Sequence, residues 1–187
     1  SVSEQFRLLA RIRKALPTLE QHAPLVANLY TDLLINDRLQ RQGELRMVDI
    51  YRKMEGARAS AAGGGASWVW ALYLRIYEHL WRLDKGDLLR TPLPEGKLGE
   101  AFDSDAWLGA RLVRVYADDW MTGAGSFATL LLRYLLEDAG EVGVMDWWQD
   151  TRDAASGCEP QGGINIDPDE GEARHPAEDP RDSGLDD

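Results

Sequence analysis

Residues 68–83, WVWALYLRIYEHLWRL, constrain the fold more than any other stretch of the chain. On an α-helix this segment is apolar around most of its circumference. Its polar residues form one stripe, spaced so that neighbours can pair along the helix: Arg75, Glu78, His79 and Arg82. A helix of this kind is buried on most sides. We therefore expect it at the centre of a helical bundle, with Trp70 and Leu74 buried.

Helical spacing of apolar residues continues on both sides of this segment. A first helix is predicted from Phe6 to Leu16, ending near Pro17, and Pro24 begins or kinks the second. Residues 37–58 form a third predicted helix. The stretch 61–67, AAGGGAS, breaks the pattern and places Ser67 as the N-cap of the central helix.

Further helices are predicted in the second half of the chain. Ser104 is the predicted N-cap of a helix over about 105–119, and Ser126 that of a helix ending at Gly140. A short helix is expected within 144–153, VMDWWQDTRD. No convincing strand pattern is found. The prediction is an all-α, compact bundle of six or seven helices.

The C-terminal end differs in composition from the rest. The net charge of the 187 residues is −11, and residues 158–187 contribute ten Asp/Glu against two Arg. Gly, Pro, Asp and Glu dominate from residue 154 onward, which is typical of disorder. We therefore predict a helical bundle domain over residues 1–153 and a disordered acidic tail over residues 154–187. Residues 1–60 carry an excess of three positive charges.

Signals for export, membranes and catalysis are weak in this sequence. Cys158 is the only cysteine, so no intrachain disulfide can form. The N-terminal stretch lacks the apolar core of a secretion signal, and no stretch approaches a membrane span. The histidines are too few and scattered for a zinc site, and no nucleophile motif is present. We expect a cytoplasmic protein without membrane contact, enzyme activity, metal or cofactor.

Two faces rich in arginine are the strongest functional signal. If residues 37–58 form one helix, the basic residues share a side opposite an apolar arc: Arg38, Arg41, Arg46, Arg52 and Lys53. In the helix after Ser104, Trp107, Arg111 and Arg114 share a second face. Arginine binds phosphates and aromatic rings stack on bases. These eight residues form the predicted nucleic-acid-binding set, and solvated surfaces with Trp107 packed under arginine stems are the alternative.

The C-terminal half resembles a known family. Residues 96–119, GKLGEAFDSDAWLGARLVRVYADD, and 128–153, ATLLLRYLLEDAGEVGVMDWWQDTRD, carry the resemblance. Its motifs are the Leu98-Gly99 turn, the run from Arg111 to Val115, the run from Leu131 to Leu136, and Met145-Asp146-Trp147. Over roughly residues 97–152 the chain resembles the CasB family, the small subunit of the CRISPR Cascade complex.

That resemblance implies a non-catalytic helical subunit that lines the belly of a guide-RNA complex. It implies other protein subunits of a ribonucleoprotein complex as partners, self-association as a head-to-tail pair, and Arg and Lys side chains that hold DNA strands. The sequence thus predicts a subunit that contacts the backbone of DNA or RNA. The alternative is an acidic interaction or inhibitor protein, such as an immunity protein or a DNA mimic, acting through protein–protein contacts.

Overall fold

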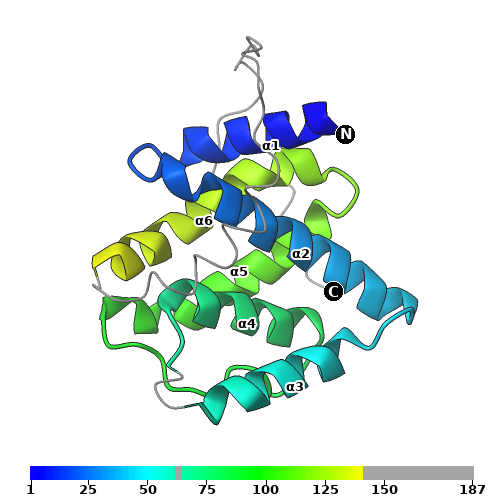
Figure 1. Cartoon of the computed structure of the whole chain (residues 1–187), viewed down its shortest axis with the longest axis vertical. Helices are drawn as coiled ribbons and strands as arrows, with labels where there is room; N and C mark the ends of the chain where they lie inside the picture. The colour runs from blue at the N-terminus through cyan, green and yellow to red at the C-terminus, as the bar shows by residue number, and fades with distance from the viewer. Residues whose placement is uncertain (62–64, 141–187) are drawn as a thin grey trace.

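A computed structural model describes residues 1–61 and 65–140, and within these residues the chain is all-α (Figure 1). The α-helices are α1 (Val2–Ala15), α2 (Ala23–Gln42), α3 (Met47–Ala59), α4 (Trp68–Leu80), α5 (Phe102–Val115) and α6 (Trp120–Gly140). Two short 3-10 turns, η1 (Glu20–His22) and η2 (Lys97–Glu100), precede α2 and α5. The predicted all-α bundle of six or seven helices is confirmed. The predicted helix within 144–153 and the acidic tail lie outside the described residues.

The central position predicted for residues 68–83 is confirmed. Every residue of α4 except His79 is buried, including Trp70 and Leu74. The helix packs against α2, α5 and α6, and in Figure 1 it lies between α3 and α5. Ser67 caps it as predicted, because its side chain accepts a hydrogen bond from the Trp70 amide. The apolar circumference of α4 therefore forms the centre of the core.

A glycine allows α4 and α5 to lie close together. A Cβ atom at Gly109 of α5 would come within 2.6 Å of Ile76 Cδ1 on α4, which is closer than two such atoms can approach. A larger residue here would require the Ile76 side chain or one of the helices to shift. This close packing brings the last two turns of α5, with Arg111 and Arg114, to the C-terminal end of α4.

The prediction of one helix over residues 37–58 is wrong. Gly43 adopts a left-handed conformation, with φ +71°, and ends α2, while α3 begins at Met47 (Figure 1). Glycine reaches this conformation without the steric cost that a Cβ imposes, so the helix stops there. The Gln40 side chain then accepts a hydrogen bond from the Val48 amide and so satisfies one of the first amides of α3.

The break at Gly43 changes which residues face the core. On a single helix over residues 37–58, Ile50 and Met54 would lie on the apolar arc opposite the basic residues, but they are 49% and 42% exposed. Arg38 and Arg41 lie on α2, Arg46 precedes α3, and Arg52 and Lys53 lie within α3. The continuous basic stripe of the prediction therefore does not exist as a single helix face.

Two helix starts also differ from the prediction. Helix α5 begins at Phe102, so Ser104 lies inside it, and Ser126 lies inside α6, which begins at Trp120. The later start was predicted from Ser126 as an N-cap, but the first turn of α6 extends back to Trp120 and includes Gly123, a poor helix former. Tertiary packing overrides that preference: the Tyr30 hydroxyl donates a hydrogen bond to the Trp120 carbonyl at 2.8 Å.

The end of α1 and the start of α2 are as predicted. Helix α1 ends before Pro17, and Pro24 lies in the first turn of α2, where its missing amide proton leaves no helix hydrogen bond unmade. None of the helices described for residues 1–61 and 65–140 combines the length and the apolar character needed to cross a bilayer.

Candidate functional site

Two adjoining clefts open at the C-terminal end of α4. The first, here called the arginine cleft, has a volume of about 490 Å³. Five arginines line it: Arg41, Arg46, Arg52, Arg82 and Arg114. The second, here called the tryptophan cleft, has a volume of about 460 Å³ and is lined by Trp107, Arg111 and His79 among others. The two clefts share Leu80, Arg82 and Arg114, so they form one continuous surface.

The structure brings together most of the residues predicted from the sequence. Six of the eight line these clefts: Arg41, Arg46, Arg52, Trp107, Arg111 and Arg114. Arg38 and Lys53 are exposed and line neither cleft. The two basic faces that the sequence placed on separate helices therefore meet at one place, and Arg82, which was not predicted as a site residue, lies between them.

Asp37 of α2 fixes two of the arginines. Its side chain is only 2% exposed. Arg41 Nε lies 3.0 Å from Asp37 Oδ2. Arg114 forms a bidentate pair with the same carboxylate, with Nε 2.9 Å from Oδ2 and Nη2 3.0 Å from Oδ1, and Nη2 also donates to the Leu80 carbonyl at 2.8 Å.

These contacts leave donors available to a ligand. A guanidinium has five N–H donors, and the Arg114 contacts with Asp37 and Leu80 use only Nε and Nη2. The Arg41 and Arg114 side chains remain 47% and 42% exposed. The buried carboxylate thus holds both groups in a fixed orientation with part of each facing the cleft.

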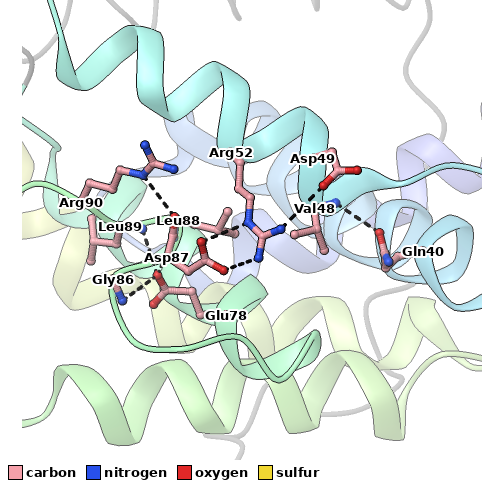
Figure 2. A network of polar contacts seen from close by, with 10 residues as sticks. All are labelled: Gln40, Val48, Asp49, Arg52, Glu78, Gly86, Asp87, Leu88, Leu89 and Arg90. Atoms are coloured by element: carbon pink, nitrogen blue, oxygen red, sulfur yellow. Dashed lines mark hydrogen bonds and ion pairs between the residues drawn. The ribbon is translucent and has the colours of Figure 1, made fainter.

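Arg52 of α3 is held in a similar way by Asp87 and Asp49, as Figure 2 shows. Its Nε and Nη2 donate to the two oxygens of Asp87 at 3.0 and 2.5 Å, and Nη1 lies 3.6 Å from Asp49. The hydrogen bond from the Arg52 guanidinium lowers the pKa of Asp87. Arg46 forms an exposed pair with Asp49. Three carboxylates therefore orient four of the five arginines in the arginine cleft.

The loop that carries Asp87 is anchored to α4. One oxygen of the buried Glu78 carboxylate accepts hydrogen bonds from the amides of Gly86, Leu88 and Leu89 at 2.8–3.0 Å (Figure 2). Glu78 also pairs with Arg75 at 3.2 Å, as the spacing in the sequence predicted. This arrangement fixes the position of Asp87 and hence that of the Arg52 guanidinium.

Arg82 adopts a backbone conformation that favours glycine. It follows the end of α4 with φ +52°, whereas the sequence placed it within the helix. Its amide donates to the His79 carbonyl, and the Leu83 amide donates to the Glu78 carbonyl, which is the Schellman pattern of a helix end. Among the residues that the structure describes, the Arg82 side chain has no hydrogen-bond or ion-pair partner.

A non-glycine residue in the left-handed region costs about 1–2 kcal/mol. Such conformations gather at functional sites, where the side chain is needed despite its cost. The backbone hydrogen bonds at Arg82 and Leu83 stabilise the helix end, whereas the Arg82 guanidinium forms no contact among residues 1–61 and 65–140 that offsets this cost. Its position at the junction of both clefts is the signal that the sequence alone did not give.

The tryptophan cleft combines an aromatic face with apolar walls. Trp107 is 44% exposed, and the Arg111 guanidinium carbon lies 4.8 Å from its ring centroid. This cation–π contact orients the indole. Leu80, Ala110 and Val115 supply apolar lining. Burial lowers the pKa of His79, so its imidazole is neutral at pH 7 and offers one donor and one acceptor.

The charges of the site favour an anionic ligand. Among the residues that the structure describes, the five arginines of the arginine cleft exceed the three carboxylates that pair with four of them, Asp37, Asp49 and Asp87, by two positive charges. Guanidinium groups bind phosphate and carboxylate oxygens in a bidentate manner. Within the described parts of the chain, no group of three or more His, Cys, Asp or Glu side chains could hold a metal ion.

Comparison of the chain with protein-family models, with curated proteins and with solved structures finds no match. The resemblance to the CasB family therefore remains a prediction that depends on the residues quoted above.

Proposed function

We propose that this protein binds the phosphate backbone of a nucleic acid in the arginine cleft, as a non-catalytic subunit of a nucleoprotein complex. The observation that carries the proposal is the convergence on one cleft of five arginines from α2, the start of α3, α3 itself, the end of α4 and α5. Paired carboxylates orient four of them, and Arg82 has its whole guanidinium available. A set of fixed guanidiniums with spare donors suits a chain of phosphates.

The resemblance to the CasB family supports the same proposal, because its members hold DNA strands through Arg and Lys. In that role the other subunits of a ribonucleoprotein complex are the protein partners. The competing interpretation, an acidic inhibitor or DNA mimic, assigns the activity to carboxylates. In the arginine cleft the carboxylates are paired with arginines, which leaves positive charge in excess.

An equilibrium titration of the full chain with single- and double-stranded DNA at several salt concentrations tests the proposal. Two variants with the same loss of charge are compared. Arg46→Gln with Arg82→Gln removes cleft cations that do not contact a buried carboxylate. Arg38→Gln with Lys53→Gln removes exposed cations outside both clefts. Circular dichroism of each variant verifies that the helices are intact.

The cleft variant is expected to reduce the slope of log K against log salt by about 1.4 on single strands and about 1.8 on duplex DNA. Each phosphate contact that is lost lowers the number of counterions released when the protein binds. The control variant is expected to leave the slope nearly unchanged. Equal losses in both variants would show that binding is spread over the surface. No salt-dependent binding by the full chain would refute the proposal.

A further inference from the structure

The tryptophan cleft differs chemically from the arginine cleft beside it. Its walls are mainly apolar, with Leu80, Ala110 and Val115 around an exposed indole, whereas the arginine cleft presents guanidiniums. Leu80, Ala110 and Val115 offer no donors to replace the hydration of a phosphate, so the part of the cleft that they line does not favour one. They favour a flat ring that can stack on Trp107. The clefts are continuous through Arg82 and Arg114, so one ligand can occupy both.

We propose that the tryptophan cleft binds an unpaired base of a nucleotide whose phosphate lies on Arg82 and Arg114. The position assigned to the phosphate rests on the function proposed above. The ligand class is a nucleotide with a free base, which a single-stranded nucleic acid and a free nucleotide both provide. A base within a duplex is stacked and paired, so it does not reach the indole without being extruded.

The geometry of α5 supports this division of the site. Trp107, Arg111 and Arg114 lie at positions i, i+4 and i+7 of one helix, so they share a face. Trp107 and Arg114 are separated by about 10 Å along the helix axis. The face thus presents an aromatic ring at one end and a phosphate-binding guanidinium at the other. Arg111 lies against the indole with its guanidinium carbon 4.8 Å from the ring centroid, which keeps the ring in place before a base arrives.

His79 adds a means of contacting the edge of a base. It is the one exposed residue of α4 and lines the same cleft. Its neutral imidazole can both donate and accept a hydrogen bond, as the edges of all four bases require. Stacking on Trp107 is tolerant of sequence, because every base has an aromatic face. The site therefore recognises that a base is unpaired more than which base it is.

An abasic strand provides the direct test. The full chain is titrated with a labelled oligodeoxyadenylate, with an abasic strand of the same length, and with a duplex. ATP is added as a competitor to distinguish a free nucleotide from a strand. The two single strands carry the same phosphates, so a difference in affinity between them reports binding of bases.

Trp107→Ala is expected to weaken binding of the base-bearing strand by about 5- to 150-fold, the range found for a base stacked on an aromatic side chain. Binding of the abasic strand and the salt slope of both strands are expected to stay unchanged. Trp107→Phe keeps an aromatic ring and is expected to retain most of the affinity. Met54→Ala, at an exposed apolar residue of α3 outside both clefts, is the matched control.

The outcomes separate this inference from the proposed function. Equal affinities of the full chain for the base-bearing and abasic strands, unaffected by Trp107→Ala, would overturn the base site and leave phosphate binding intact. ATP binding that depends on Trp107, without binding of any strand, would support the base site with a free nucleotide as ligand and refute the proposed function. Absence of binding to every probe would refute both. If Trp107→Ala does not fold, the abasic comparison on the intact chain and Trp107→Phe still decide the question.

Discussion

The two ends of α4 show how differently one helix can end. At the N-terminal end, the Asp138 carboxylate accepts hydrogen bonds from the Trp68 and Val69 amides at 2.8 and 3.0 Å, and Ser67 accepts one from Trp70. All of these groups are buried. At the C-terminal end, the chain turns at Arg82, which adopts a left-handed backbone conformation. Two clefts lie at this end of the helix.

Both ends have a charge that complements the helix dipole, an acid at the N-terminus and arginines at the C-terminus. They differ in how many hydrogen-bonding groups remain available to a ligand. The Asp138 carboxylate is buried and bound to backbone amides, so it stabilises the fold. The arginines at the other end have donors that face solvent. The contrast predicts that substitutions at the N-terminal end lower the free energy of unfolding without changing binding. Removal of arginines at the C-terminal end is expected to weaken binding without lowering the free energy of unfolding.

Trp70→Ala is expected to have the largest effect on stability. The side chain is buried in the first turn of α4, and its indole N–H donates to Glu55 at 3.0 Å. Truncation leaves a cavity and removes the indole hydrogen bond of the buried Glu55 carboxylate, which keeps its ion pair with Arg58, at a cost of about 3–5 kcal/mol in the free energy of unfolding. Urea denaturation measures this change. An unchanged midpoint would show that the N-terminal end of α4 is not part of the core.

Asp138→Ala comes next, with an expected loss of about 2–4 kcal/mol, because two buried amides lose charge-assisted hydrogen bonds. DNA affinity at fixed salt is expected to stay the same. Glu137→Ala, at the exposed neighbouring residue, is the control and is expected to change stability by less than about 0.5 kcal/mol. A loss of DNA affinity in folded Asp138→Ala would contradict the separation of roles between the two ends.

The centre of this fold could be predicted from the sequence, since the apolar circumference of residues 68–83 leaves little choice of position. Pro17, Pro24 and Ser67 also marked helix ends correctly, because each acts through local chemistry. The cap from Asp138 could not be predicted. It lies 70 positions from Trp68 in the chain, and only the packing of α6 against α4 brings them together.

Six of the eight predicted site residues lie in the two clefts, but the helix that was used to group the arginines of residues 37–58 does not exist as one element. The arginines of residues 37–58 were grouped by extending one helix across Gly43, which ends α2. They still meet in one cleft. Asp37 on α2 pairs with Arg41 and Arg114, and Asp87 in the loop after α4 pairs with Arg52. Arg82 gave no signal as a site residue, since a left-handed backbone at a non-glycine residue cannot be recognised from periodicity. Periodicity also could not show that the basic faces of two helices meet in one surface.

Arg82→Gly is expected to increase stability and to weaken DNA binding, so it separates the two roles of the C-terminal end of α4. Glycine adopts φ +52° without strain, so the free energy of unfolding is expected to rise by about 1 kcal/mol. Thermal denaturation, expected to show a higher melting temperature, measures the gain. Lys53→Gly, a glycine substitution inside α3, is the contrasting control and is expected to lower stability by about 1 kcal/mol. A lower melting temperature for Arg82→Gly would show that the Arg82 side chain stabilises the helix end.

The smallest expected effect is the pH dependence contributed by His79. Burial lowers its pKa in the folded protein below the unfolded value of 6.5, so the unfolded state binds a proton first as the pH falls. Above about pH 7 His79 is neutral in both states and contributes nothing. Below that, it lowers stability progressively until the pH passes its folded pKa. His79→Gln is expected to remove this part of the decrease in urea midpoints between about pH 7 and pH 5, and an identical decrease in both proteins would contradict the assignment.

The salt dependence of DNA binding by Arg82→Gly tests the central claim most directly, because this variant keeps every described carboxylate–arginine pair and removes only the guanidinium at the junction of the clefts. The slope of log K against log salt is expected to fall by about 0.7 on single strands or about 0.9 on duplex DNA, while the protein becomes more stable. Arg38→Gln should leave the slope unchanged. A slope equal to that of the parent protein in Arg82→Gly would contradict the claim that the C-terminal end of α4 binds phosphate.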